Sequence, residues 1–205
     1  AVYGTSVRLA ATAIVMTRLE TSGVVADGVV LAPGPAATHD VEAEIDAGCV
    51  IAGNARMGVL VASEDKAKSR TRVAADVSRN AKGGVWIQGG GAVLELADKA
   101  RLSANTLIGV GVTGGARIET SGGRVDHTVP GEWGETLSGL PEVVADGIGI
   151  FEGGTGRLEG IALDGLNRAA VIVHKGAPKA GGDELDLVLQ NAKMTNCGVA
   201  LVVNK

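Results

Sequence analysis

Short aliphatic segments of one pattern recur along the chain. A small residue is followed by three residues of which the first and third are aliphatic, as in Gly58-Val59-Leu60-Val61. The copies start at Gly28, Gly58, Gly84, Gly109, Gly147, Ala170 and Gly198. Successive starts lie 23 to 38 residues apart. Self-similarity at such a period is typical of a solenoid rather than of an ordinary globular domain.

Each copy is predicted to be a short β-strand. Alternate side chains of a strand point to the same side, so Val59 and Val61 share a face. When such strands stack in a parallel sheet, these positions form two internal aliphatic columns. Helical spacing fits poorly, and each Gly inside a helix would cost about 1 kcal/mol.

Asparagine recurs just before the strands. Asn54, Asn80 and Asn105 each lie four residues before the Gly of the next copy. Asn tolerates the left-handed backbone conformation and hydrogen-bonds its own backbone. These residues are therefore predicted to form tight bends between strands.

Through the Asn turn and the Gly-Val-x-Val strand, the chain resembles the right-handed parallel β-helix family, the pectin-lyase-like fold, along nearly its whole length. The resemblance implies an all-β, single-domain right-handed parallel β-helix of about seven coils over residues 1–205. Family members include polysaccharide lyases and hydrolases, surface adhesins and phage tailspikes. The fold therefore leaves the activity open.

The repeats fill almost the whole chain. They begin by Val7 and run nearly to Lys205, and the longest interruption is an inserted loop at 119–145. Solenoids normally need polar caps on their open ends. Because neither end has room for much of a cap, we expect a fragment of a longer chain, or an end that pairs with another subunit.

Composition excludes some classes of function. The formal net charge of −4 argues against a nucleic-acid partner. No uncharged apolar run approaches the roughly 18 residues of a membrane span. Cys49 and Cys197 fall five coils apart, so both are predicted to be free thiols. The three His residues show no metal-ligand spacing, so no metal site is predicted. We expect an extracellular or cell-surface setting.

The resemblance also suggests where chemistry could lie. Lyases of the family combine calcium-holding Asp residues with a basic residue that abstracts a proton, and its hydrolases use clustered Asp residues. The best such group here is Asp146 and Asp164, one coil apart, with Arg124, Asp126 and His127 in the inserted loop. If the protein is an enzyme, Asp146, Asp164, Arg124 and His127 are its predicted catalytic residues. Alternatively, both Asp are turn residues, because each directly precedes a Gly.

Two further groups suggest binding. In the insertion, Trp133 lies near Glu132 and Glu135, and an aromatic ring beside carboxylates can stack on a sugar. The alternative is that Trp133 only fastens the loop to the wall.

The outward-facing residue in the middle of each repeated strand is uncharged. These residues are Val30, Leu60, Trp86, Gly111, Gly149, Ile172 and Ala200. A sheet that is apolar on both faces is normally covered, so Leu60, Trp86 and Ile172 are predicted to form an interface with a protein partner or a second subunit. The alternative is a merely tolerated apolar wall.

Two hypotheses about function follow. The first is a non-catalytic surface or secreted β-solenoid that acts as a structural or adhesive interaction module, without a cofactor. The second is a polysaccharide lyase or glycoside hydrolase that acts on an acidic polysaccharide and that, as a lyase, would use calcium.

Overall fold

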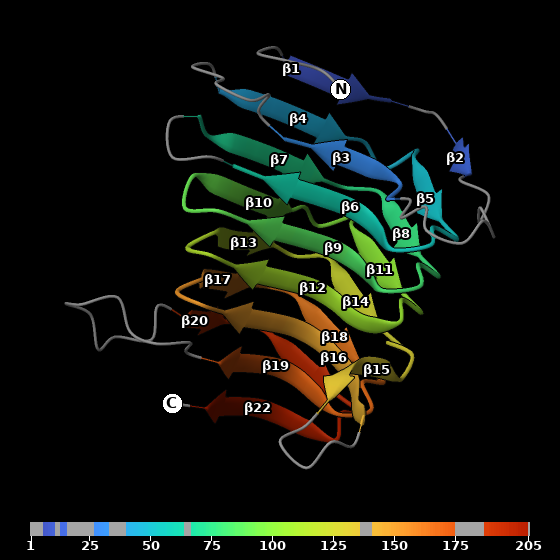
Figure 1. The fold of residues 1–205 in the computed structure, drawn as a ribbon, viewed down its shortest axis with the longest axis vertical. Helices are drawn as coiled ribbons and strands as arrows, with labels where there is room; N and C mark the ends of the chain where they lie inside the picture. Colours follow the sequence, from blue (N-terminus) through green and yellow to red (C-terminus); the bar gives the residue numbers. More distant parts are fainter. Residues whose placement is uncertain are drawn as a thin grey trace.

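The chain forms three parallel β-sheets that run along a single stack (Figure 1). The structure, a computed structural model, describes residues 6–10, 13–15, 27–32, 40–63, 67–135, 141–174 and 187–204. These residues contain strands and no helix. The expectation of an all-β parallel architecture is confirmed, and the topology is consistent with a parallel β-solenoid.

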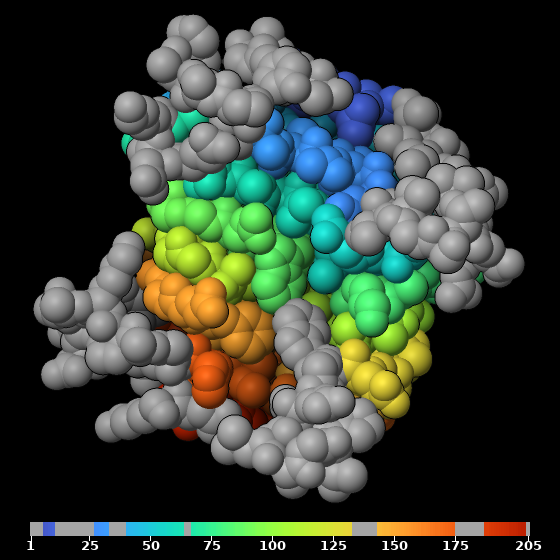
Figure 2. Space-filling model, in the orientation of Figure 1, coloured from blue at the N-terminus to red at the C-terminus, as the bar shows by residue number. Residues whose placement is uncertain are grey.

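Successive strands visit the three sheets in turn, and each visit to all three is one coil. Sheet A contains β1 (Ser6–Leu9), β4 (Val41–Ile45), β7 (Ser69–Val73), β10 (Ala92–Leu96), β13 (Arg117–Ser121), β17 (Thr155–Glu159) and β20 (Leu187–Gln190). Sheet B contains β2 (Ala13–Val15), β5 (Val50–Ala52), β8 (Asp76–Ser78), β11 (Arg101–Ser103), β14 (Arg124–Asp126), β18 (Ala162–Asp164) and β21 (Lys193–Thr195). Sheet C contains β3 (Val29–Leu31), β6 (Met57–Ala62), β9 (Gly83–Gln88), β12 (Leu107–Thr113), β16 (Pro141–Phe151), β19 (Ala169–His174) and β22 (Val199–Asn204). In the space-filling view the coils appear as successive bands from blue to red (Figure 2).

The repeated aliphatic segments are the strands of sheet C, and they line the core as predicted. One internal column contains Val59, Val85, Val110, Ile148 and Val171, and each is fully buried. A second column contains Val61, Ile87, Val112, Ile150 and Val173. Burial of one such side chain contributes about 1.5–3 kcal/mol, so the two columns supply much of the stability of the stack.

The seventh copy of the repeat is shifted relative to the predicted alignment. Ile172 pairs with Val202, and Val171 pairs with Leu201. The outward position of this strand is therefore Val202 and not Ala200. Alternating aliphatic residues continue past the expected copy to Val203, so the pattern alone fits two registers two residues apart.

The glycine that opens most of the copies is required by the distance between coils. A Cβ atom on Gly84 would lie 2.6 Å from the carbonyl oxygen of Gly109, and one on Gly109 would lie 2.7 Å from that of Gly147. The same contact occurs between Gly28 and Gly58, at 2.6 Å. Glycine is therefore present because the backbone of the next coil occupies the space of a side chain.

The recurrent Asn residues form a buried ladder at the bend between sheets B and C. Asn80 Oδ1 accepts hydrogen bonds from the backbone N–H of Asn54 at 3.0 Å and from its Nδ2 at 2.7 Å. Asn80 Nδ2 in turn donates to Asn105 Oδ1 at 2.8 Å. The left-handed residue is the preceding one, for example Arg79 with φ of 55°. The predicted bend is thus present, but these three Asn side chains point inward and link the coils.

The inserted segment is shorter than the expected loop at 119–145. Residues 119–126 belong largely to β13 and β14, which are regular strands of the stack. The additional structure is β15 (Gly131–Glu135), which pairs antiparallel with the first part of β16. Within this hairpin Glu132 is exposed. The side chains of Trp133 and Glu135 lie outside the described part of the structure, so a sugar-binding role for this group stays a prediction.

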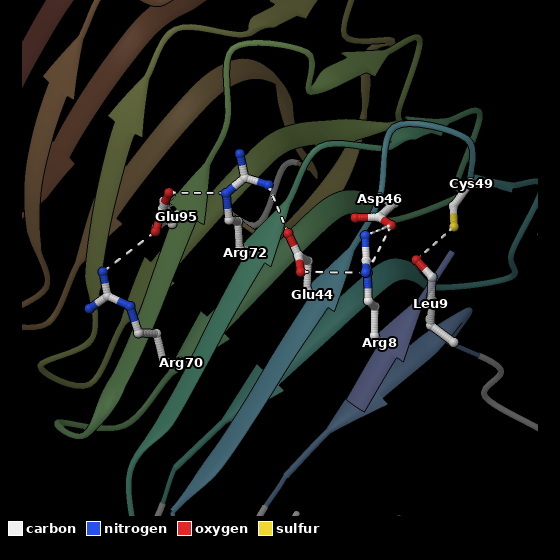
Figure 3. Close-up of polar contacts among 8 residues, drawn as sticks. All are labelled: Arg8, Leu9, Glu44, Asp46, Cys49, Arg70, Arg72 and Glu95. Atoms are coloured by element: carbon white, nitrogen blue, oxygen red, sulfur yellow. Dashed lines mark hydrogen bonds and ion pairs between the residues drawn. The ribbon is translucent and has the colours of Figure 1, made fainter. Parts of the chain in front are cut away.

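Charged side chains form a continuous ladder across the outer face of sheet A (Figure 3). Arg72 lies between Glu44 of β4 and Glu95 of β10, with nitrogen–oxygen distances of 3.2 and 3.3 Å. Arg8 continues the ladder toward β1 through Glu44 at 3.7 Å. Arg70 extends it in the other direction. Each exposed pair contributes little by itself, but opposite charges on successive strands favour this register over a shifted one.

The two cysteines are free thiols, as predicted. Cys49 is fully buried, and its Sγ lies 3.3 Å from the carbonyl oxygen of Leu9 in the preceding coil (Figure 3).

Candidate functional site

Three of the four predicted catalytic residues lie together on two adjacent strands of sheet B. Arg124 begins β14, His127 follows it, and Asp164 ends β18 in the adjacent coil. Arg124 Nη2 donates to Asp164 Oδ2 at 2.7 Å. Asp164 Oδ1 accepts from Thr195 Oγ1 at 2.7 Å and from Asn196 Nδ2 at 2.9 Å. Both oxygens of this carboxylate are therefore occupied by protein donors.

Asp126 is the central carboxylate of this cluster, and sequence analysis assigned it no role. It pairs directly with Asp164 in the register of sheet B, and only 1% of its surface is exposed. Its Oδ2 accepts from Arg124 Nε, while its Oδ1 lies 3.4 Å from Nδ1 of His127. The available signal was the alternation of Arg124 and Asp126, which places both side chains on one face of a strand.

His127 is held in place by backbone geometry. Its φ of 52° lies in the left-handed region, which is uncommon for residues other than Gly. The ring lies against the next coil, so that a Cβ on Gly165 would be 3.1 Å from Nε2. The side chain is 65% exposed, and the imidazole is therefore accessible at the surface beside two carboxylates.

The surroundings of Asp126 keep it ionised. Burial favours the neutral acid and raises its pKa. Polar and charged neighbours act in the opposite direction; these are Ser103, Arg124, His127 and Arg101. The second effect is larger, so the pKa of Asp126 lies below its usual range.

Asp164 is also held in its charged form. Hydrogen bonds from Thr195 and Asn196 lower its pKa most, and the positive charge of Arg124 lowers it further. Desolvation opposes these effects only in part. Both carboxylates therefore stay ionised to lower pH than an ordinary Asp, whereas a general acid needs a raised pKa.

Asp146 belongs to a different structural element. It lies in β16 of sheet C, is fully buried, and accepts hydrogen bonds from Arg168 Nε at 2.9 Å and from the backbone N–H of Ala169 at 3.1 Å. The same arrangement occurs near the other end of the stack. There Asp27 accepts from Arg56 Nε at 2.8 Å and from the backbone N–H of Met57 at 3.0 Å. Both Asp residues link one coil to the next, and Asp146 lies within a strand rather than in the turn given as its alternative.

The predicted interface residues lie in one column on the outer face of sheet C. Leu60 pairs with Trp86, and the column continues through Gly111 and Gly149 to Ile172. Leu60 and Trp86 are half-buried, whereas Ile172 is only 8% exposed. The contact with a partner stays a prediction.

Aromatic rings occupy the space above the two glycines of this column. A Cβ on Gly111 would overlap the ring of Trp86, and one on Gly149 would overlap the ring of Phe151. The two rings are stacked, with centroids 6.2 Å apart and planes inclined by 19°. Trp86 therefore has a structural role in covering the sheet, because it fills volume that glycine leaves empty.

Two other kinds of site are absent from the described ranges. Those ranges contain no group of three or more His, Cys, Asp or Glu residues placed to hold a metal ion. They also contain no helix of the length and apolarity needed to cross a bilayer.

Comparison with protein-family models, with curated proteins and with solved structures finds no match to this chain.

The lowered pKa of Asp126 predicts a characteristic pH dependence. A carboxylate whose pKa falls on folding stabilises the protein above its unfolded-state pKa of about 3.9, and this contribution is lost as the pH falls through the folded-state value. Asp126→Asn should therefore lower Tm at pH 7, and the difference from wild type should narrow below about pH 4.

Thermal unfolding followed by circular dichroism from pH 7 to pH 2 would measure this difference. The matched control is Asp98→Asn, which changes an exposed Asp and should leave Tm close to wild type throughout. A Tm difference for Asp126→Asn that stays constant across the pH range would contradict the prediction.

Proposed function

We propose that this protein is a right-handed parallel β-helix of the pectin-lyase-like type that serves as a non-catalytic structural or adhesive module. The three parallel sheets support this fold, and the right hand follows from the strong preference for right-handed crossovers between parallel strands. We place its action at the cell surface or outside the cell, where its outer faces would contact another protein or a polysaccharide.

The observation that carries the non-catalytic proposal is the state of the Asp126–Asp164 pair. Glycoside hydrolysis requires one carboxyl group that is protonated at working pH, beside a second that is ionised. Here neighbouring donors lower the pKa of both carboxylates. Asp126 and Asp164 can therefore hold adjacent coils together as charged acceptors, but neither can act as the proton donor.

Calcium binding by the same pair has equally little support. Calcium is held by carboxylate and carbonyl oxygens that are available to the ion. Both oxygens of Asp164 accept hydrogen bonds, and Arg124 neutralises charge on Asp126 and Asp164 together. Because three of the four oxygens of this pair accept hydrogen bonds from Arg124, Thr195 or Asn196, the pair fits an ion-pair network better than a lyase metal site.

The alternative, a polysaccharide lyase or hydrolase, is favoured by one observation. Arg124, His127 and Asp164 come from two coils and meet at one surface, where the His127 side chain is exposed. A basic residue at that position could abstract a proton from an acidic sugar. Asp146 would not take part, because it is buried and bonded to Arg168 and Ala169 in sheet C.

A cleavage assay separates the two functions. The protein would be incubated with a panel of acidic polysaccharides in the presence of calcium, and products would be followed by absorbance of unsaturated ends and by reducing ends. We expect neither product. Cleavage that is lost in Asp164→Asn and retained in the control Asp98→Asn would overturn the proposal and place an active site beside β14.

A further inference from the structure

Two arginine side chains lie side by side on the outer face of sheet B. Arg101 of β11 is directly opposite Arg124 of β14 in the register of the sheet, and their side chains are 59% and 44% exposed. On sheet A, by contrast, Arg72 lies between Glu44 and Glu95. Like charges directly opposite each other destabilise a sheet. The arrangement on sheet B therefore has a cost that the alternating charges of sheet A avoid.

A single buried carboxylate holds the two guanidinium groups near each other. Asp126 Oδ2 accepts from Arg124 Nε and lies 3.7 Å from Arg101 Nε. Arg124 is fixed a second time, because its Nη2 donates to Asp164 Oδ2 at 2.7 Å. Both carboxylates are less exposed than the guanidinium groups that they hold. The charge nearest the solvent at this place is therefore positive.

Several donors of the two guanidinium groups form no hydrogen bond within the described residues. Each Arg side chain has five N–H donors. Arg124 uses Nε and Nη2 for the two Asp residues, and its Nη1 donates to no other described group. Arg101 donates no hydrogen bond to a described residue, because the carboxylate oxygen paired with it is 3.7 Å away. These donors can therefore bind a ligand while the bonds between coils stay intact.

Two more basic residues flank the pair at the adjacent turn. Arg79, Ala104 and His127 occupy the same position in three successive coils, with left-handed backbone φ values of 55°, 54° and 52°. Arg79 and His127 are exposed, and Ala104 between them carries only a methyl group. The opposing charge is Asp76, which is half-buried and lies opposite Arg101 in the preceding coil. The exposed ionisable side chains next to Ala104 are therefore basic.

We propose that Arg101 and Arg124 form a binding site for a phosphate or sulfate group. Planar guanidinium groups donate paired hydrogen bonds to such tetrahedral oxyanions, which offer three or more acceptor oxygens. A carboxylate offers only two oxygens, and one guanidinium group can occupy both. Because buried Asp126 already restricts the two side chains, less conformational freedom is lost on binding. An anion between the arginines also offsets the repulsion between their like charges.

This site deepens the proposed function and rests on it. It gives the outer face of sheet B a ligand of defined chemistry, which is either a free ion or an ester on a polymer, and it involves no cleavage. Failure to bind an anion would remove this inference alone. Cleavage of a polysaccharide would instead remove the proposed function.

Nitrogen–proton NMR of the arginine Nε–H groups, during titration of the protein with sodium phosphate or sodium sulfate, tests the site. Sodium chloride at matched ionic strength is the control for general screening of charge. We expect saturable shifts of the Arg101 and Arg124 signals with phosphate and with sulfate, and no saturable shift with chloride. Arg101→Gln should weaken binding by about tenfold, because it removes charge-assisted hydrogen bonds to the anion.

The matched control is Arg157→Gln, which replaces an Arg of sheet A that is 55% exposed and paired with Glu159. This variant should bind phosphate as wild type does. Circular dichroism would check that both variants are folded, and Arg101 has no hydrogen bond to a described residue that the substitution could break. Equal shifts with chloride and phosphate, or wild-type affinity in Arg101→Gln, would overturn the proposal.

Dextran sulfate and unsulfated dextran distinguish the two sources of the anion. Dextran sulfate that binds more tightly than free sulfate, through the same Arg101, would support the site with an ester on a polymer as its ligand. Equal binding per sulfate group would support the site with a free ion as its ligand. Binding of unsulfated dextran as tight as that of dextran sulfate would overturn the proposal, because the charged group would then contribute nothing.

Discussion

Replacement of Asn80 by alanine should lower the free energy of unfolding by about 4 kcal/mol, because it leaves buried donors without acceptors. Asn80 is fully buried, and its Oδ1 accepts both the backbone N–H and the side-chain Nδ2 of Asn54. Each buried donor that loses its acceptor costs about 1–3 kcal/mol. Asn105 Oδ1 also loses the bond from Asn80 Nδ2. Urea unfolding followed by circular dichroism would measure the change.

Asn167→Ala provides the control for this experiment. Asn167 precedes the sixth strand copy, but it is exposed, and its replacement should change stability by less than about 0.5 kcal/mol. Equal effects of Asn80→Ala and Asn167→Ala would mean that the ladder adds nothing beyond ordinary turn chemistry.

Replacement of Gly84 by alanine should cost about 3 kcal/mol, because the new methyl group meets backbone that cannot move away. Its Cβ would lie 2.6 Å from the carbonyl oxygen of Gly109 and 2.9 Å from Nδ2 of Asn105. Relief of this contact would separate adjacent coils and lengthen the hydrogen bonds of sheet C. The measurement is again urea unfolding.

Gly90→Ala is the matched control, since a Cβ on Gly90 would have no atom within 4 Å. This substitution should be neutral, or slightly stabilising through the unfolded chain. A neutral Gly84→Ala would show that the stack accommodates a side chain between coils. The repeated glycine would then need another explanation.

The strand repeat was sufficient to predict the layout of the sheets. Its alternation places Val59 and Val61 inside, and the structure has both fully buried. The same alternation could not fix the register of the seventh copy, because apolar residues extend through Val203 on both possible alignments. The bends were predicted at the correct positions. The inward direction of the Asn80 side chain could not be predicted, because it depends on hydrogen bonds to Asn54 and Asn105 in the two adjacent coils.

The candidate site could be predicted only in part, because closeness in sequence differs from closeness in a stack. Asp146 and Asp164 are one coil apart along the chain, yet they occupy sheets C and B. Asp126 and Asp164 are direct partners in sheet B across a much longer sequence separation. To select the pair Asp126 and Asp164, each residue had first to be assigned to its sheet. That assignment depends on the short strands Arg124–Asp126 and Ala162–Asp164.

The direction of the bonds between coils has a mechanical consequence. The hydrogen bonds of all three sheets, the Asn ladder and the ion pairs of sheet A run along the axis of the stack. A force applied along that axis would load every boundary between coils equally, and only the bonds of one boundary would resist it there, so the coils would separate one after another at low force. A force applied along the strands would instead load many bonds at once in shear. A module of this kind withstands tension across its width far better than along its length.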